Sequence, residues 1–179
     1  MERIKVHDKT FEKFLDYEKI ETAIKQLADD VHRDFSDSVP VFLCVLKGSF
    51  MFASELFKNY QGAAEITFIR VASYTGTQTT GAVHTLFELN EDIKNRDVII
   101  LEDIIDSGIT IKHLVEELEN HRPRRVKVAT LLIKPDAVST DIQPDYVGLE
   151  IPNDFIVGFG LDYNGLGRNT RDIYKIVDD

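Results

Sequence analysis

Residues 98–118 join a continuous apolar run to a polar turn and a second apolar pattern. Residues 98–101 read Val-Ile-Ile-Leu, and the acidic pair Glu102-Asp103 follows them directly. After the turn at 106–108, apolar residues recur at helical spacing, namely Ile111, Leu114, Val115 and Leu118. An apolar run without polar alternation is typical of a parallel sheet that is buried on both faces. The stretch therefore predicts an α/β fold with a strand, a turn and a helix at its centre.

The turn at residues 106–110 has the chemistry of a phosphate site. A helix begins with free backbone N–H groups and the positive end of its dipole. Ser107 and Thr110 add hydroxyl donors, and Gly108 permits close approach of a ligand. The Walker pattern is absent, because Ile109 follows the glycine where that pattern has lysine. Glu102 and Asp103 lie just upstream, where they suit hydroxyls and Mg²⁺, so a sugar phosphate fits the whole stretch.

An ordinary strand-to-helix junction is the alternative interpretation of this stretch. In that case Asp106 or Ser107 would only cap the helix. Two adjacent carboxylates repel each other and are poor choices for stabilising the end of a strand. The acidic pair therefore favours a functional site.

The stretch Val98–Thr110 resembles the PRPP-binding motif of the type I phosphoribosyltransferases. The resemblance implies that Glu102 and Asp103 meet the ribose hydroxyls directly or through metal and water. It also implies that the turn wraps the 5'-phosphate of PRPP, with contacts from Asp106, Ser107, Gly108, Ile109 and Thr110.

The composition of the whole chain limits the classes of function. Its 179 residues suffice for one domain with a full core. A formal net charge of −10 disfavours a dedicated binder of nucleic acid or of anionic membranes. We expect no membrane span, a cytoplasmic protein, and a buried structural thiol at Cys44, the only cysteine.

Further strands and helices are expected on both sides of the central motif. Residues 1–10 suit a short edge strand or an arm, and a helical apolar pattern runs from Phe14 to Val31. Other apolar runs predict strands at 41–46, 66–71 and 126–133 and a helix from Phe50 to about Phe57. The basic run at 121–125 is interpreted as a solvated loop that favours the negative end of the preceding helix.

Two loops extend the resemblance toward pyrophosphate. Leu-Cys-Val-Leu-Lys-Gly at 43–48 is similar to the pyrophosphate loop of the family's hypoxanthine-guanine branch. That similarity implies contacts from Lys47 and Gly48 and a non-proline cis bond between Leu46 and Lys47. The polar stretch 72–83 resembles the family's flexible loop, whose Ser-Tyr pair would be Ser73-Tyr74. A simple hairpin tip is the alternative for this stretch.

The carboxyl-terminal part of the chain indicates the base. Lys134 directly follows a predicted strand, where a lysine of the resembling family bonds the 6-oxo group of hypoxanthine or guanine. Residues 155–163 are similar to the family's purine-binding stretch, with Ile156 where valine is usual. The resemblance implies that Phe155 stacks on the purine and that the Ile156 backbone reads its edge. It further implies that Asp162 serves Mg²⁺ and that Arg168 contacts pyrophosphate.

The resemblance leads to one set of expectations for fold and activity. The fold is a type I phosphoribosyltransferase fold in a single domain, residues 1–179, with a mainly parallel sheet flanked by helices. Its core spans about 16–134, and a small hood comes from about 1–15 and 135–179. The reaction joins N9 of hypoxanthine or guanine to the phosphoribosyl group of PRPP, with Asp106 as general base. Glu102, Asp103 and Asp162 would serve the metal.

Two other functions remain open at this stage. One is a phosphoribosyltransferase for xanthine or another base. The second is a PRPP-sensing regulator that keeps the fold and binds nucleic acid, for which a net charge of −10 is unsuitable. For the enzyme we expect small-molecule partners, no nucleic acid, no membrane, and assembly into a homodimer or homotetramer.

Overall fold

The computed structural model describes residues 2–71, 89 and 91–177. In chain order, its helices and strands are β1 (Arg3–Val6), β2 (Lys9–Leu15), α1 (Tyr17–Phe35), β3 (Val41–Leu46), α2 (Phe50–Asn59), β4 (Glu65–Arg70), β5 (Asp97–Ile105), α3 (Ile109–Asn120), β6 (Arg125–Ile133), a 3-10 turn (Pro135–Ala137), β7 (Tyr146–Glu150), β8 (Ile156–Val157) and β9 (Ile173–Ile176). The residues predicted to form the flexible loop, including Ser73 and Tyr74, lie outside the described residues.

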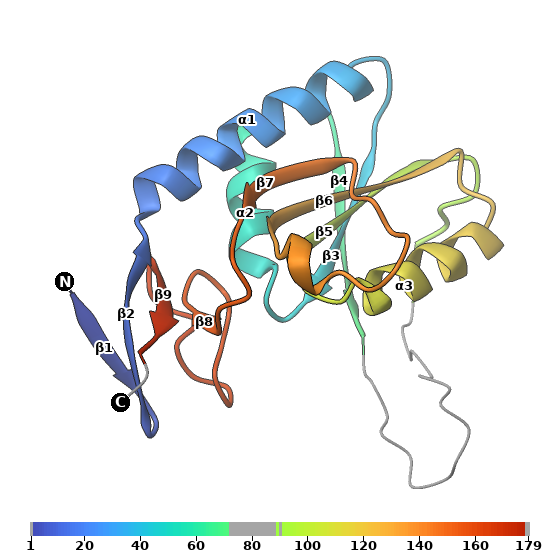
Figure 1. The fold of residues 1–179 in the computed structure, drawn as a ribbon. Coiled ribbons are helices and arrows are strands. Elements are labelled where there is room, and N and C mark those ends of the chain that lie inside the picture. The colour runs from blue at the N-terminus through green and yellow to red at the C-terminus, as the bar shows by residue number, and fades with distance from the viewer. Residues whose placement is uncertain (1, 72–88, 90, 178–179) are drawn as a thin grey trace, which may run out of the picture.

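The larger sheet has five parallel strands in the order β4-β3-β5-β6-β7 (Figure 1). Helices α1 and α2 pack on one face, around Phe42, Ile99 and Leu101. Helix α3 packs on the other face, against Val98 and Ile100. Because β5 is covered on both faces, its residues can be apolar without alternation. The predicted α/β fold with a parallel sheet between helices is confirmed.

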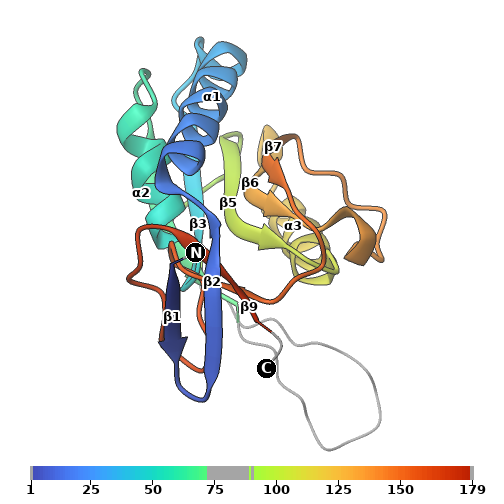
Figure 2. The ribbon, with the colours of Figure 1, turned by 60° about the vertical axis from the view of Figure 1, so that its left-hand side comes forward.

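The smaller sheet is antiparallel and takes its strands from both ends of the chain, in the order β1-β2-β9-β8. Figure 2 shows it beside the larger sheet. Strand β7 falls within the residues 135–179 that were assigned to the hood, yet it pairs with β6 in the larger sheet. Strand pairing therefore places the start of the hood after Glu150 rather than after Lys134.

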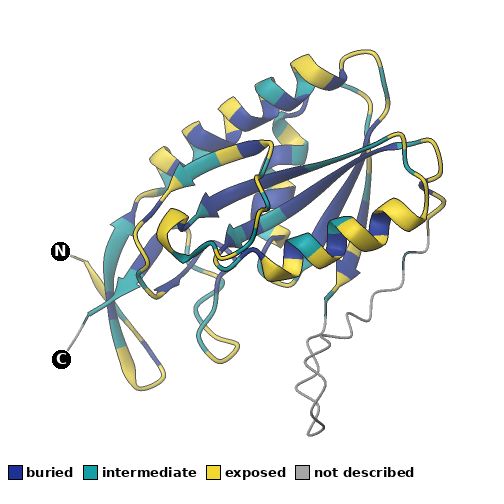
Figure 3. Cartoon of the chain, turned by 45° about the vertical axis from the view of Figure 1, so that its right-hand side comes forward, coloured by how far each residue is buried: buried dark blue, intermediate teal, exposed yellow. Residues whose placement is uncertain are grey.

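Helix α1 begins later than its apolar pattern indicates. Phe14 and Leu15 belong to β2, and Asp16 caps the helix by accepting a hydrogen bond from the Lys19 backbone at 2.9 Å. Because β2 leads directly into α1, the apolar side chains at the end of the strand fall by chance at the helical spacing. From Tyr17 on, one side of α1 is buried and the other is exposed (Figure 3). No described helix has both the length and the apolar character needed to cross a membrane.

The basic run at 121–125 is more than a solvated loop, because two of its arginines bind a buried carboxylate. Arg124 and Arg125 both bind the carboxylate of Asp97, which begins β5 and is buried. The Arg125 guanidinium also lies 4.4 Å from the centre of the Phe35 ring. The two guanidinium groups hold the pKa of Asp97 well below its usual range, and Arg124 has the larger effect. These contacts tie the amino ends of β5 and β6 to the end of α1.

We expect Asp97→Asn to destabilise the protein by roughly 2–3 kcal/mol at pH 7, because two charge-assisted hydrogen-bond pairs are lost. The folded pKa of Asp97 lies below the unfolded one, so its stabilisation is complete above the unfolded value and is lost as pH falls through the folded one. Urea unfolding between pH 3 and pH 7 measures this effect. The variant's unfolding free energy should therefore decline less steeply toward acid than that of the parent.

Asp141→Asn is the matched control for Asp97→Asn. Asp141 also forms a short ion pair, with Lys112 at 2.6 Å, but its side chain is 82% exposed. Solvent-exposed pairs contribute little to stability. If both variants unfold at the same urea concentration, the buried position of Asp97 carries no special stabilisation.

Candidate active site

A cleft of about 390 Å³ opens at the carboxyl ends of the parallel strands. Ligands of open α/β sheets bind at this edge. The cleft takes lining residues from both sheets and from each motif singled out in the sequence that lies within the described residues. They include Lys47, Gly48, Glu102, Asp103, Asp106, Thr110, Lys134, Phe155, Ile156, Asp162 and Arg168. The structure thus brings these predicted site residues together.

The acidic pair lies near the carboxyl end of β5 and lines the cleft. Asp103 is buried, and its Oδ1 accepts a hydrogen bond from the Ile104 backbone at 3.0 Å. The Oε2 atom of Glu102 is enclosed and has no hydrogen-bond partner within the described residues. Burial, and then the negative charge of Asp103, raises the pKa of Glu102, and burial likewise raises that of Asp103. This pair needs hydroxyl donors or a cation to be stable in its charged form.

The turn between β5 and α3 forms a second, smaller hollow of about 120 Å³ that continues the cleft. Gly108 precedes α3 with φ 81°, a left-handed conformation that favours glycine. Ser107, Gly108, Thr110 and the acidic pair's Glu102 line the hollow, and Ile109 is the first residue of α3. The hollow thus lies at the amino end of the helix, where an anion is stabilised.

Residues 139–142 support this turn, and sequence reasoning missed them. The Ser139 backbone donates to the Ser107 carbonyl at 3.0 Å. A Cβ atom at Gly108 would overlap Thr140 Oγ1 and lie 2.6 Å from Ile142 Cγ2, so the glycine is also needed for close packing. The polar stretch 139–142 carries no pattern of its own that would have indicated this contact.

Lys134 and Asp106 form an ion pair across the cleft. Lys134 Nζ donates to Asp106 Oδ2 at 2.9 Å. The lysine side chain is 9% exposed and the carboxylate is 58% exposed. An ammonium group has three N–H donors, so two remain for a ligand oxygen. The pair forms because β5 and β6 are parallel neighbours with Ile105 opposite Ile133.

The loop after β3 packs its backbone against the acidic pair. The peptide bond between Leu46 and Lys47 is cis, as the resemblance implied. A Cβ atom at Gly48 would overlap the Asp103 carboxylate, with Cγ of that residue 2.5 Å away. Gly160, at φ 100°, approaches the Gly48 carbonyl so closely that a side chain there would overlap it. Glycine at 48 thus leaves room for the Asp103 carboxylate, and glycine at 160 permits the close approach to the Gly48 backbone.

The segment after β7 supplies the outer wall of the cleft. Phe155 is 45% exposed, and Ile156 opens the two-residue strand β8. Arg168 binds the Asp162 carboxylate at 2.6 Å and the Gly160 carbonyl, also at 2.6 Å. Within 155–163 the strand is limited to residues 156–157, and turns follow it.

The donor set fits a magnesium ion that shares its ligands with a substrate. In the described part of the chain, no three carboxylate, imidazole or thiol side chains come together as a ready metal site. Mg²⁺ usually takes one or two carboxylates and completes its shell with water and phosphate oxygens. The unpartnered Oε2 of Glu102 and the nearby Asp162 suit this mode of binding.

Cys44 is buried under the cleft and is not part of it. Its thiol lies 3.1 Å from the Ser49 hydroxyl, and burial raises the pKa of Cys44 to about 11. A thiol with this pKa is almost entirely protonated at neutral pH and is a poor nucleophile. The prediction of a buried thiol is confirmed.

Comparison with known proteins identifies the family. The family model for the phosphoribosyl transferase domain matches residues 11–164. A hypoxanthine-guanine phosphoribosyltransferase of Lactococcus lactis is 43% identical over 164 residues, which cover 90% of this chain and 89% of that one. A relative of the same name from Staphylococcus aureus is 39% identical over 92% of both chains.

Solved structures agree with these relatives. A hypoxanthine-guanine phosphoribosyltransferase of Bacillus anthracis superposes with a TM-score of 0.87 at 36% identity, covering 97% of this chain and 100% of that one. A hypoxanthine phosphoribosyltransferase of Staphylococcus aureus gives 0.87 at 38% identity, covering 93% and 91%. The family model, the curated relatives and the superposed structures together show that this chain belongs to the phosphoribosyltransferase family, in its hypoxanthine-guanine branch.

Proposed function

We propose that this protein is a purine-salvage enzyme that joins hypoxanthine or guanine to the phosphoribosyl group of PRPP, giving IMP or GMP and pyrophosphate. One observation carries the proposal: a single cleft is lined by the acidic pair, by the start of the phosphate turn and by the buried Lys134. Sugar phosphate and 6-oxopurine therefore have complementary groups within reach of each other. The relatives' names support the same substrates.

The reaction breaks the bond between C1' of PRPP and the pyrophosphate oxygen, and the bonding electrons leave with pyrophosphate. The purine N9 lone pair forms the new bond to C1' through an oxocarbenium-like state, as at other glycosidic centres. The turn from Asp106 to Thr110 holds the 5'-phosphate. Glu102 and Asp103 accept hydrogen bonds from the ribose hydroxyls. Holding both reactants in one cleft lowers the entropic part of the barrier.

Asp106 accepts the proton that the purine loses. As the bond to N9 forms, positive charge grows on the base, and the N7 proton passes to the Asp106 carboxylate. Lys134 donates to the 6-oxo group with an N–H that Asp106 leaves free. The two side chains, 2.9 Å apart, hold each other in place before the base arrives.

Magnesium and the pyrophosphate contacts complete the site. When bound, Mg²⁺ supplies positive charge for the leaving pyrophosphate. Glu102, Asp103 and Asp162 are the side chains that would hold it. Lys47, the Gly48 backbone and Arg168 bind pyrophosphate. Phe155 stacks on the purine, and the Ile156 backbone reads its edge.

Lys134→Gln should weaken the discrimination between 6-oxo and 6-amino purines. Lysine can only donate, so the amino group of adenine faces a donor, whereas glutamine can also accept. We expect the ratio of kcat/KM for hypoxanthine over adenine to fall at least about tenfold. Lys127→Gln is the matched control, because Lys127 lies near the opposite end of β6 from Lys134 and pairs with Asp145. An unchanged ratio in Lys134→Gln would count against the role of Lys134.

An assay panel tests the proposed function against its alternatives. Hypoxanthine, guanine, xanthine, adenine, orotate and uracil are each supplied with PRPP, with and without Mg²⁺. We expect turnover of hypoxanthine and guanine that requires Mg²⁺. Exclusive use of xanthine or of a pyrimidine would favour another base phosphoribosyltransferase.

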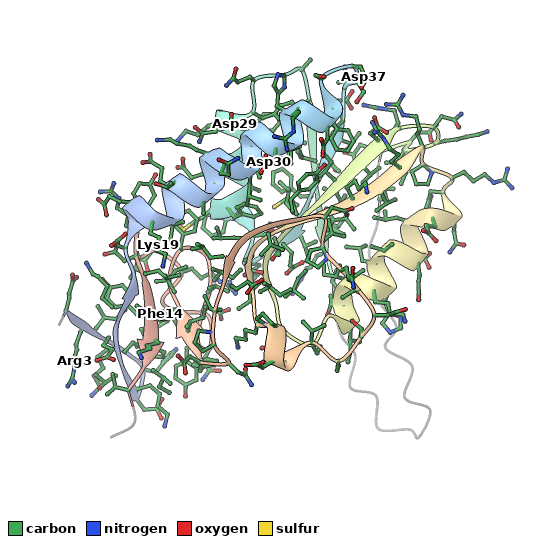
Figure 4. All side chains as sticks on the ribbon, turned by 45° about the horizontal axis from the view of Figure 1, so that its top comes forward. Arg3, Phe14, Lys19, Asp29, Asp30 and Asp37 are labelled. Atoms are coloured by element: carbon green, nitrogen blue, oxygen red, sulfur yellow. The ribbon has the colours of Figure 1, made fainter. Side chains whose placement is uncertain are left out.

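A PRPP-sensing regulator that binds nucleic acid is the second alternative. Figure 4 shows Asp29 and Asp30 on α1 and Asp37 beyond its end, with Lys19 at the opposite end of the helix. Together with the formal net charge of −10, these acids disfavour binding of a phosphate backbone. We therefore expect no gel shift of DNA or RNA at physiological salt.

Three further properties belong to this proposal. The chain forms one domain with a core and a terminal hood. It assembles as a homodimer or homotetramer, which sedimentation would measure. It acts in the cytoplasm, where free purine bases and PRPP are available.

A further inference from the structure

An aromatic cluster lies behind Phe155 in the smaller sheet. The Phe155 ring meets the Tyr163 ring edge-on, with centres 5.7 Å apart and planes at 85°. The buried Phe11 of β2 lies 6.2 Å from Phe155 and 6.4 Å from Tyr163. The Phe155 backbone is fixed by a 2.9 Å hydrogen bond from Ile176 to its carbonyl. The orientation of its half-exposed ring therefore depends on these two aromatic neighbours.

Tyr163 is in turn held by the hairpin turn between β1 and β2. Its hydroxyl donates to Asp8 Oδ1 at 3.0 Å. The His7 ring packs edge-on against the Tyr163 ring at 5.6 Å, and His7 Nε2 lies 3.2 Å from the Asn164 carbonyl oxygen. Residues 7 and 8 are 155 or more positions away from these partners along the chain. The amino-terminal hairpin thus reaches the wall of the cleft.

The hairpin turn adopts a backbone that needs support. Val6 pairs with Lys9, so the loop has two residues, and His7 has φ 53°. Glycine or asparagine is the usual choice at such a position, and histidine there is uncommon. A residue with an unfavourable backbone persists where its side chain makes compensating contacts. For His7 those contacts are with Tyr163 and Asn164.

We propose that Tyr163, anchored by Asp8 and His7, is a positioning residue for purine binding. Its ring sets the angle of the Phe155 ring, and the hairpin turn fixes Tyr163 from behind. The inference rests on the proposed stacking of purine on Phe155. Tyr163 touches neither substrate, so its loss should affect how tightly the purine is held and leave the chemical step unchanged.

Kinetics of Tyr163→Leu test this role, because leucine keeps an apolar side chain but lacks both the aromatic ring and the hydroxyl that bonds Asp8. We expect KM for hypoxanthine at saturating PRPP to rise about two- to tenfold, which is the effect of losing the interaction energy of one aromatic pair. The KM for PRPP and the kcat should stay within about twofold of the parent. The dissociation constant of IMP, measured by calorimetry, should rise by the same factor as the KM for hypoxanthine.

The hydroxyl is tested with a matched pair of variants. Tyr163→Phe removes the bond to Asp8, and Tyr174→Phe removes the equally long 3.0 Å bond from Tyr174 to Glu2 in the same sheet. No contact between Tyr174 and Phe155 lies among the aromatic pairs of the described residues. We expect KM for hypoxanthine to rise in Tyr163→Phe and in Asp8→Ala, with no further rise when the two are combined. Tyr174→Phe should keep the parental value.

Two results would overturn the inference. The first is an unchanged purine KM in Tyr163→Leu. The second is a rise of both KM values together with a fall in kcat, which would indicate general loosening of the fold. Phe155→Ala separates this inference from the proposed function: if its purine KM rises while that of Tyr163→Leu does not, only the positioning role fails. If Phe155→Ala also leaves KM unchanged, the stacking role of Phe155 is wrong as well.

Discussion

Gly48→Ala is expected to lower kcat/KM by at least about a hundredfold, because a shift of about 1 Å in a catalytic group has this effect. The added methyl group would occupy the space of the Asp103 carboxylate. Asp103 is buried beside Glu102 and cannot move into solvent without breaking its bond to the Ile104 backbone. Either the acidic pair or the pyrophosphate loop must therefore leave its position.

The same change should destabilise the fold by about 1–3 kcal/mol, the usual cost of overpacking. Gly62→Ala is the control for overpacking away from the cleft, because its methyl group would lie 2.8 Å from Cε1 of the buried Tyr60; it should lower stability and leave kcat/KM close to the parental value. Thermal unfolding and steady-state kinetics measure both effects.

A second substitution separates the structural effect of Gly48→Ala from the catalytic one. Asp103→Ser in the Gly48→Ala background removes the overlapping carboxylate. We expect the melting temperature to recover while activity stays low, because the carboxylate that meets the ribose hydroxyls is missing. Recovery of activity in the double variant would show that Asp103 has no role in the reaction. Full activity of Gly48→Ala itself would contradict the close packing of the loop after β3 against Asp103 of β5.

Local patterns in the sequence indicated most of the fold. The apolar run of β5, the polar turn and the spacing in α3 are all short-range features, and they led to a parallel sheet between helices. Once that sheet was expected, Lys47, Asp106 and Lys134 followed as neighbours, because the ends of parallel strands meet at one edge. The assignment of pyrophosphate and purine contacts depended on resemblance, since a lysine after a strand has no specific chemistry by itself.

Features that depend on distant contacts were not visible in the sequence. The support of Gly108 by residues 139–142 involves polar residues without periodicity. Asp97 gives no local sign of its two arginine partners, 27 and 28 positions away. Strand β7 was assigned to the hood because its pairing with β6 is set by the sheet and not by its own residues. The start of α1 was misjudged because Phe14 and Leu15 suit a strand and a helix equally.

Asp106→Asn is expected to lower kcat by roughly 10- to 1,000-fold with a modest change in KM, the range for loss of a general base. Asparagine keeps the size of the side chain and can still accept a bond from Lys134 through its amide oxygen, but it cannot take up a proton. The geometry of the cleft should therefore survive while proton removal from N7 is lost. Asp136→Asn, an exposed acid two residues after Lys134, is the control and should retain the parental rate.

Single-turnover measurements make this prediction sharper than steady-state kinetics. Product release often limits kcat and would hide part of a slower chemical step. A catalyst cannot shift the equilibrium between substrates and products, so forward synthesis of IMP and its reverse reaction with pyrophosphate must slow by the same overall factor. In the reverse direction the protonated Asp106 would return the proton to N7. An unaltered single-turnover rate in Asp106→Asn would refute the role of Asp106 and leave Lys134 as its ion-pair partner only.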